Sequence, residues 1–254
     1  MLRRTALLFS AAALCGTADA SVDYVRQTKH SGLQKVTGSL NEKTTPKGTG
    51  GLCDADVNQL SGYFEINAPN KTNEHYFYWM FESRNQPKTD PFILWLTGGP
   101  GCSGMLALLN ENGPCTIDEH LNTVNNTKSW TNAANVLWID QPTGVGFSYG
   151  DSGDYDHDEI GVRDDMYHFL TEFFDAHPEY ADAPFYVFGE SYGGHYAPNV
   201  AYRVWQGNQK ATADNKINLK GLAVGNGLTD PAIQYVHGVI VLALFCLPCC
   251  TPTQ

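Results

Sequence analysis

Four short, unbroken apolar runs constrain the fold of this chain more than any other feature of its sequence. They cover residues 92–96, 136–139, 185–188 and 219–224. A run of this length without polar alternation is typical of a strand covered on both faces. Between the second and third runs, apolar side chains recur at helical spacing over residues 158–177. Strands that alternate with helices predict an α/β fold with a mostly parallel sheet and helices on both faces.

The region before the first run predicts a different local structure. Two segments rich in aromatic and β-branched residues, 61–66 and 75–81, flank a turn-forming stretch at 67–70. They predict an N-terminal antiparallel β-hairpin. Residues 21–50 are polar, rich in Lys, Thr and Gly and without a clear period, which predicts a flexible lead-in or a pro-segment before the main domain at 51–235.

The first twenty residues have the pattern of a signal peptide. Arg3 and Arg4 precede a short apolar run, and Ala18-Asp19-Ala20 supplies a small-x-small cleavage site. The run is too short to span a bilayer, so we expect no transmembrane segment there. The alternative is a short buried helix. A signal peptide predicts entry into the secretory pathway, with an extracellular or a vacuolar or lysosomal destination.

Secretion changes how other features are interpreted. Asn70 and Asn125 begin sequons and become predicted glycosylation sites. The cysteines become candidate disulfide partners, and their spacing predicts no zinc site, so we expect neither a metal nor a cofactor. The formal net charge is −11 and no cluster of Lys and Arg is present, which argues against a nucleic-acid partner.

The third apolar run leads directly into Gly189-Glu190-Ser191-Tyr192-Gly193, which matches G-x-S-x-G. In a strand-to-helix turn this pattern exposes a nucleophilic serine above the sheet, at a helix N-terminus. The N–H of Tyr192 is the expected first oxyanion donor, and Gly98-Gly99, after the first run, suit the second. The alternative is a glycine-rich turn with an idle serine.

Longer blocks around these motifs are more specific than the motifs themselves. They are WLTGGPGCSG at 95–104, ENGP at 111–114, NVLWIDQP at 135–142 with GVGFSY at 144–149, GESYGGHYAP at 189–198, and the strand block at 221–230. In this order they resemble the blocks of the serine carboxypeptidases, over about Leu60 to Tyr235. The resemblance implies an α/β-hydrolase fold and the release of single residues from the C-termini of peptides and proteins, which would be the substrates.

The resemblance also implies roles for individual residues. Ser191 is the implied nucleophile, and Gly99 and Tyr192 are the implied oxyanion donors. The site for the substrate's terminal carboxylate would be formed by Trp95, Thr97, Gly98, Glu111 and Glu190. Two close glutamates cannot easily both ionise, so one keeps a proton that it can donate to a carboxylate. Thr97 departs from the family, which usually has Asn here.

The triad that a serine nucleophile needs is incomplete in this sequence. A histidine base and an acid are required, and the resemblance places both beyond a large insertion further along than Gln254. A local triad of Ser191, Asp230 and His237 is the alternative. Residues 236–254 look like a non-homologous, apolar, Cys-rich tail, explained by a retained intron, a frameshift or an incomplete gene model, or by a genuine variant with a lipid-modified tail.

We therefore expect a fold that is incomplete at its C-terminus. Because the family pairs some cysteines with later positions, Cys53, Cys102 and Cys115 are expected to lack partners. The predicted function is that of a serine-type carboxypeptidase acting through an acyl-enzyme, with this chain truncated and weakly active or inactive. The alternatives are an acyltransferase of the same fold and a non-catalytic secreted fragment.

Overall fold

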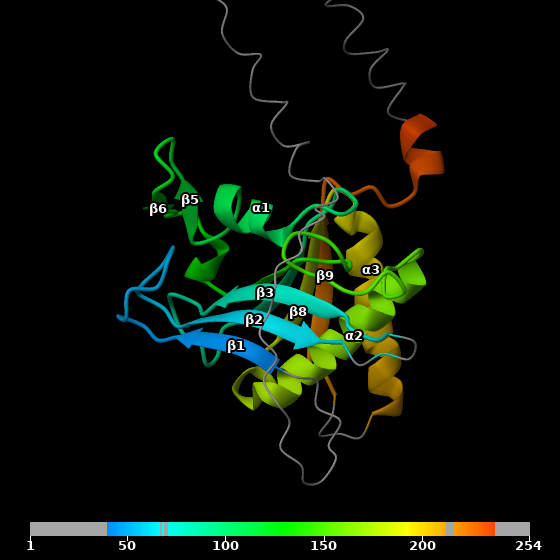
Figure 1. The fold of residues 1–254 in the computed structure, drawn as a ribbon, viewed down its shortest axis with the longest axis horizontal. Coiled ribbons are helices and arrows are strands. Elements are labelled where there is room, and N and C mark those ends of the chain that lie inside the picture. The colour runs from blue at the N-terminus through cyan, green and yellow to red at the C-terminus, as the bar shows by residue number, and fades with distance from the viewer. Residues whose placement is uncertain (1–39, 67, 69–70, 212–215, 237–254) are drawn as a thin grey trace, which may run out of the picture.

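The computed structural model describes residues 40–66, 68, 71–211 and 216–236 (Figure 1). The predicted signal peptide, residues 21–39 of the predicted lead-in and residues 237–254 of the predicted tail lie outside the described residues. None of the helices in the described part of the chain combines the length and the apolar character needed to cross a membrane.

A seven-stranded sheet organises these residues, in the order β1-β2-β3-β7-β4-β8-β9. Its strands are β1 (Leu40–Thr45), β2 (Gln59–Glu65), β3 (His75–Phe81), β4 (Phe92–Leu96), β7 (Asn135–Ile139), β8 (Phe185–Glu190) and β9 (Leu219–Gly225). β7, β4, β8 and β9 run parallel, whereas β1, β2 and β3 pair antiparallel. The predicted hairpin is β2 and β3, and the four apolar runs are the four parallel strands.

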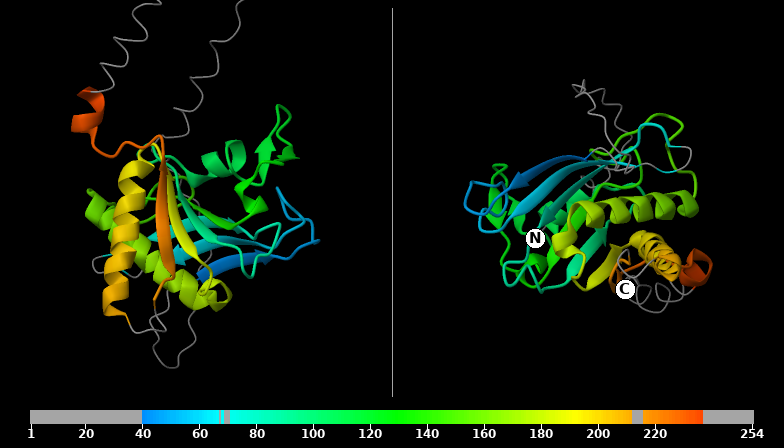
Figure 2. Two further views of the ribbon diagram at one scale, coloured as in Figure 1. Left: turned by 180° about the vertical axis from the view of Figure 1, so that it is seen from behind. Right: turned by 90° about the horizontal axis from the view of Figure 1, so that it is seen from below.

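Helices cover both faces of this sheet (Figure 2). They are α1 (Gly104–Asn110), α2 (Glu159–Ala176) and α3 (Gly193–Lys210), with short 3-10 turns η2 (Trp130–Asn132) and η3 (Pro178–Tyr180). The predicted helix at 158–177 is α2, which begins after Asp158 because that side chain accepts from the N–H groups of Ile160 and Gly161. A separate ribbon of β5 (Cys115–Ile117) and β6 (Thr123–Asn125) follows α1.

Strand β4 shows how one apolar run serves two cores. All five of its residues are buried. Phe92, Leu94 and Leu96 join the core under α2 and α3, while Ile93 and Trp95 join the core under α1. This division follows from the alternation of side chains along a strand, and it confirms the prediction of strands covered on both faces for β4.

Two predictions need correction. The lead-in predicted over 21–50 includes β1, which is an edge strand and not a flexible segment from Leu40 on. The Glu42 carboxylate accepts hydrogen bonds from Tyr78 and pairs with His177, so tertiary contacts order a polar strand. At the other edge, β9 is not a buried strand, and Leu222 is 47% exposed.

Candidate active site

The candidate site lies where two neighbouring parallel strands end. β4 and β8 pair in register, with Leu96 opposite Gly189. Because parallel strands end at the same edge of a sheet, the loop after β4 and the turn after β8 lie side by side, the usual place of active sites in open α/β sheets. The predicted residues Thr97, Gly98 and Gly99 are in the first loop, and Ser191 is in the second.

Ser191 occupies a strained turn between β8 and α3. Its φ is +56°, in the left-handed region that residues with a Cβ seldom adopt. The Ser191 N–H donates to the carbonyl of Gly225, and its carbonyl accepts from Gly194 and Leu228, so neighbouring backbone holds this conformation. The side chain is exposed. These features are those of a nucleophile elbow, which we define as residues 189–193.

Close backbone contacts explain the glycines of the elbow. A Cβ on Gly189 would lie 2.5 Å from the carbonyl oxygen of Gly193, and one on Gly193 would lie 2.7 Å from that of Leu96. The loop after β4 packs equally tightly, because a Cβ on Gly98 would lie 2.5 Å from the Tyr192 nitrogen and 2.8 Å from Cβ of Ser191. The two loops therefore touch through bare backbone.

The predicted oxyanion donors are placed at this contact. Gly99 follows Gly98 and has a φ of +117°, a conformation open to glycine alone among common residues. Tyr192 follows the serine and precedes the first turn of α3. Within the described residues, neither backbone N–H donates a hydrogen bond. The two groups are thus unoccupied donors on either side of the loop contact.

Trp95 and Thr97 lie in the floor of the site. Both are buried, and the Trp95 Nε1–H donates to Thr97 Oγ1 over 3.1 Å. The Trp95 ring meets Trp130 edge-to-face at a centroid distance of 5.1 Å, and Trp130 meets Phe188 at 5.4 Å. Because Thr97 Oγ1 already accepts a hydrogen bond, its hydroxyl proton remains available for a substrate acceptor.

The two predicted glutamates come together from different elements. Glu111 ends α1, and Glu190 is the last residue of β8. Partial burial, the Glu190 charge and a hydrogen bond between the two carboxyls raise the pKa of Glu111 to about 7. The residue as a whole is exposed, so this carboxyl faces solvent as well as its partner. The structure therefore places an acid that stays protonated in mildly acidic solution beside Ser191.

The segment that carries Glu111 is fastened from below. The buried Trp138 Nε1–H donates to Asn112 Oδ1 over 3.0 Å, and Asn126 Nδ2 donates to the Gly113 carbonyl over 2.9 Å. A disulfide joins Cys53 to Cys115. The expectation that these two cysteines lack partners was therefore wrong.

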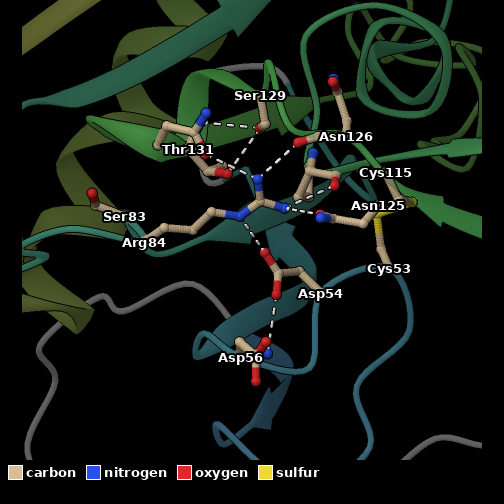
Figure 3. Close-up of polar contacts among 12 residues, drawn as sticks. Cys53, Asp54, Asp56, Ser83, Arg84, Cys115, Asn125, Asn126, Ser129 and Thr131 are labelled. Atoms are coloured by element: carbon tan, nitrogen blue, oxygen red, sulfur yellow. Dashed lines mark hydrogen bonds and ion pairs between the residues drawn. A yellow bond between two sulfur atoms is a disulfide. The ribbon is translucent and has the colours of Figure 1, made fainter.

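Arg84 connects the same region to the rest of the fold (Figure 3). It donates from Nε to Asp54 over 2.7 Å, and from its terminal nitrogens to acceptors on Pro114, Asn125, Asn126 and Asn132. Asn125, one of the two sequon residues, is exposed, and its Oδ1 is the acceptor, 2.7 Å from Arg84 Nη2. The other, Asn70, lies outside the described residues.

Two residues near the site were not among the predicted ones. Asp140 is buried directly after β7, and its carboxylate accepts from Ser103 Oγ, Gly104 N–H and Phe147 N–H. Its position after a buried strand was the available signal. Glu159 accepts from the Tyr192 hydroxyl over 2.9 Å. Nothing in the local sequence indicated that contact, because it joins α2 to the elbow across the fold.

The residues considered for a local triad stay apart from these contacts or undescribed. The His195 ring lies 4.5 Å from the Tyr192 ring, which indicates a packing role. Asp230 is exposed and caps a helical turn through Ile233 and Gln234. His237 lies outside the described residues. Within them, no histidine is hydrogen-bonded to Ser191, so the base and the acid stay predictions.

The sheet order, the elbow after β8 and the glycine loop after β4 define an α/β-hydrolase fold. Comparison with known proteins refines this class. The serine carboxypeptidase profile matches residues 49–243, a range that includes part of 236–254. The chain therefore belongs to the serine carboxypeptidase family.

Individual relatives agree with this assignment. Serine carboxypeptidase S10 family member 1 of Dictyostelium discoideum is 50% identical, over 70% of this chain and 42% of that protein. Serine carboxypeptidase 3 of rice is 51% identical, over 75% of this chain and 36% of that protein. The crystal structure of yeast Kex1, a prohormone-processing carboxypeptidase, superimposes with a TM-score of 0.68 at 30% identity, covering 74% of this chain and 42% of that one. The chain thus spans less than half the length of these relatives.

Proposed function

We propose that this chain carries the nucleophile, the oxyanion donors and the terminal-carboxylate site of a serine-type carboxypeptidase. The observation that carries the proposal is the meeting of three features at one edge of the sheet. They are Ser191 at its left-handed φ, the Gly98 loop packed on it, and the Glu111–Glu190 pair. An esterase site would need the first two, whereas a protonated carboxyl pair beside the nucleophile suits a substrate that ends in a carboxylate.

The proposed reaction is acyl transfer in two steps. Ser191 Oγ attacks the carbonyl carbon of the last peptide bond, and the N–H groups of Gly99 and Tyr192 stabilise the resulting oxyanion. The serine proton passes through a histidine base to the leaving nitrogen, the C–N bond breaks, and the terminal amino acid departs. Water then hydrolyses the ester and releases the shortened peptide. The base and its acid partner, as in the sequence-based prediction, belong to later positions of the whole protein.

The glutamate pair supplies the preference for a free C-terminus. Below a pH of about 7 Glu111 keeps its proton, so it donates to one oxygen of the substrate carboxylate. Trp95 and Thr97 supply further donors from the floor of the site. Above that pH each further unit leaves about a tenth as much of the protonated form, so binding weakens as pH rises.

The experiment that tests the nucleophile is labelling of the folded chain with a fluorophosphonate, followed by mass spectrometry of the elbow peptide. We expect slow labelling at Ser191, none in Ser191→Ala, and unchanged labelling in Ser152→Ala, whose serine is an exposed loop residue. A peptide with a free carboxylate should slow the labelling more than its C-terminal amide. A folded chain that is never labelled would contradict the proposal and favour a non-catalytic fragment.

Assays of the products separate carboxypeptidase from acyltransferase. The first releases an amino acid from a peptide, and the second transfers an acyl group from an acyl-glucose to an alcohol or amine. We expect peptide release to exceed acyl transfer in a protein that contains the complete triad. In this chain alone we expect weak release or none.

We also propose that the protein enters the secretory pathway. The signal-like pattern of residues 1–20 and the Cys53–Cys115 disulfide support this, because disulfides persist in oxidising compartments. Asn125 is the proposed glycosylation site that the structure describes. Its Oδ1 is bound by Arg84, so a glycan on Nδ2 would leave that bond intact. Secretion from a glycosylating host should add a glycan at Asn125 that Thr127→Ala removes.

A further inference from the structure

Away from the candidate active site, three carboxylates surround one lysine. Lys71 Nζ lies 2.6 Å from Asp165, 3.0 Å from Asp156 and 3.3 Å from Glu74. The carboxylates also lie close to one another, with one oxygen from each within 4.8 Å of the others. We call these four residues the lysine–carboxylate cluster. The lysine ammonium occupies the place that a metal ion would need.

The cluster is buried. Glu74 is 0% exposed, and the side chains of Asp156 and Asp165 are 4% and 3% exposed. Lys71 is 11% exposed along its side chain. Charges in such a place are poorly solvated, so their mutual interactions are far stronger than at the surface.

The groups around the cluster do not supply a second cation that contacts the carboxylates. Lys71 also donates to the Asp154 carbonyl over 2.5 Å. Glu74 Oε1 accepts from the Thr143 hydroxyl. The carboxylate of Asp154 is turned away, toward the backbone N–H groups of Thr72 and Asn73. The hydroxyl of buried Tyr76 faces the same carboxylates and is neutral.

Hydrogen-bond accounting points to a proton within the cluster. If all three carboxylates were ionised, Lys71 would leave a net charge of about −2 in a buried site, a state that burial strongly disfavours. Within the described residues, Glu74 Oε2 and Asp156 Oδ2 are buried and have no hydrogen-bond partner. A carboxyl proton held between the groups would lower the charge and give an unpartnered oxygen a donor.

We propose that the lysine–carboxylate cluster is a buried proton-binding latch that strengthens the fold in acidic solution and weakens it as the pH approaches neutrality. The latch joins three segments that are far apart in the sequence. Lys71 and Glu74 precede β3, Asp156 lies in the loop before α2, and Asp165 is in α2. The loop packs directly on the helix, since a Cβ on Gly161 would lie 2.4 Å from Asp156 Oδ1.

The direction of the effect follows from the pKa values. Burial, with the charges of Glu74 and Asp156, raises the pKa of Asp165 from 3.8 to about 8, although its hydrogen bond to Lys71 opposes the shift. Burial likewise raises the pKa of Glu74. Between these values the folded chain binds a proton that the unfolded chain has lost, so the free energy of unfolding falls as pH rises. Below the unfolded pKa both states are protonated and the effect is absent.

The test is chemical denaturation of the purified full chain at several values of pH between 5 and 7, for the wild type and Asp165→Asn. The amide keeps the shape of the carboxyl and cannot ionise. One extra bound proton makes the unfolding constant of the wild type rise by roughly tenfold per pH unit more than that of the variant, about a hundredfold over this range. Histidines and Glu111 also titrate here, but they are common to both proteins and cancel in the difference.

A matched control and a second variant keep the test decisive. Asp175 is an exposed carboxylate on the same helix, and Asp175→Asn should follow the wild-type pH dependence. If Asp165→Asn does not fold, Asp156→Asn serves, because it also leaves two carboxylates for one lysine. Infrared spectroscopy of the folded wild type at pH 6 should show a protonated carboxylic acid that the cluster variant lacks. Parallel pH curves for wild type and cluster variant would overturn the proposal.

Discussion

Replacing Arg84 with methionine should destabilise the region that carries Glu111. The guanidinium donates to five acceptors on segments that β3, α1 and the β5–β6 ribbon separate in the sequence (Figure 3). Methionine retains an apolar stem of similar shape and removes every donor. The Asp54 carboxylate, whose side chain is 7% exposed, would be left without its cation.

The magnitude follows from the burial of this pair. Removing one partner of a fully buried ion pair costs about 3–5 kcal/mol. Arg84 is 20% exposed, so water compensates in part, and we expect a loss of about 3 kcal/mol in the free energy of unfolding. For a domain of this size, that loss corresponds to a fall of roughly 6–12 °C in Tm.

The assay is urea denaturation at neutral pH, with Arg84→Lys as the matched variant. Lysine keeps the charge near Asp54 but lacks the planar fork that reaches several carbonyls at once, so it should lose only about 1–2 kcal/mol. Equal losses for lysine and methionine would mean that the fork, and not the buried charge, stabilises the region. A loss below about 0.5 kcal/mol for methionine would refute the reasoning.

Three further predictions concern the core, the disulfide and the elbow. Phe173→Ala should lower the free energy of unfolding by about 3–5 kcal/mol because its ring is fully buried among other aromatic rings. Ile160→Ala on the same helix, 55% exposed, should change it by less than about 0.5 kcal/mol in the same urea titration. Replacing Cys53 and Cys115 together with serine opens a loop of 62 residues and should cost about 4 kcal/mol, measured against the oxidised wild type. Gly98→Ala should suppress fluorophosphonate labelling of the elbow serine through a Cβ clash with its backbone, and unchanged labelling would contradict the proposed loop contact.

Most of the sheet could be predicted from the sequence because its strands are read by local pattern. β4 and β7 are unbroken apolar runs, and the structure buries every residue of both. The helix predicted at 158–177 begins and ends within a residue of α2, since Asp158 is a strong N-cap and Pro178 stops the helix.

The elements that were missed depend on contacts distant in sequence. β1 is a polar edge strand whose order comes from pairing with β2 and from the contacts of Glu42 with Tyr78 and His177. The exposure of β9 was equally hidden, because an apolar run does not reveal whether a neighbour covers it.

The candidate site was predictable where chemistry is written into short motifs. The elbow, the Gly98-Gly99 loop and the Glu111–Glu190 pair are brought together as the pattern and the resemblance implied. The lysine–carboxylate cluster was not, because its members are scattered between residues 71 and 165 and each resembles an ordinary surface charge in sequence.

The most direct test of the account is calorimetric titration of the folded Ser191→Ala chain with a short peptide and with its C-terminal amide, at pH 5 and pH 8. This measurement needs no base and no turnover. We predict that the free acid binds at pH 5, that its affinity falls by about tenfold at pH 8 as Glu111 loses its proton, and that the amide binds weakly at both. Equal binding of acid and amide, or an affinity for the acid that does not change with pH, would contradict the assignment of this site.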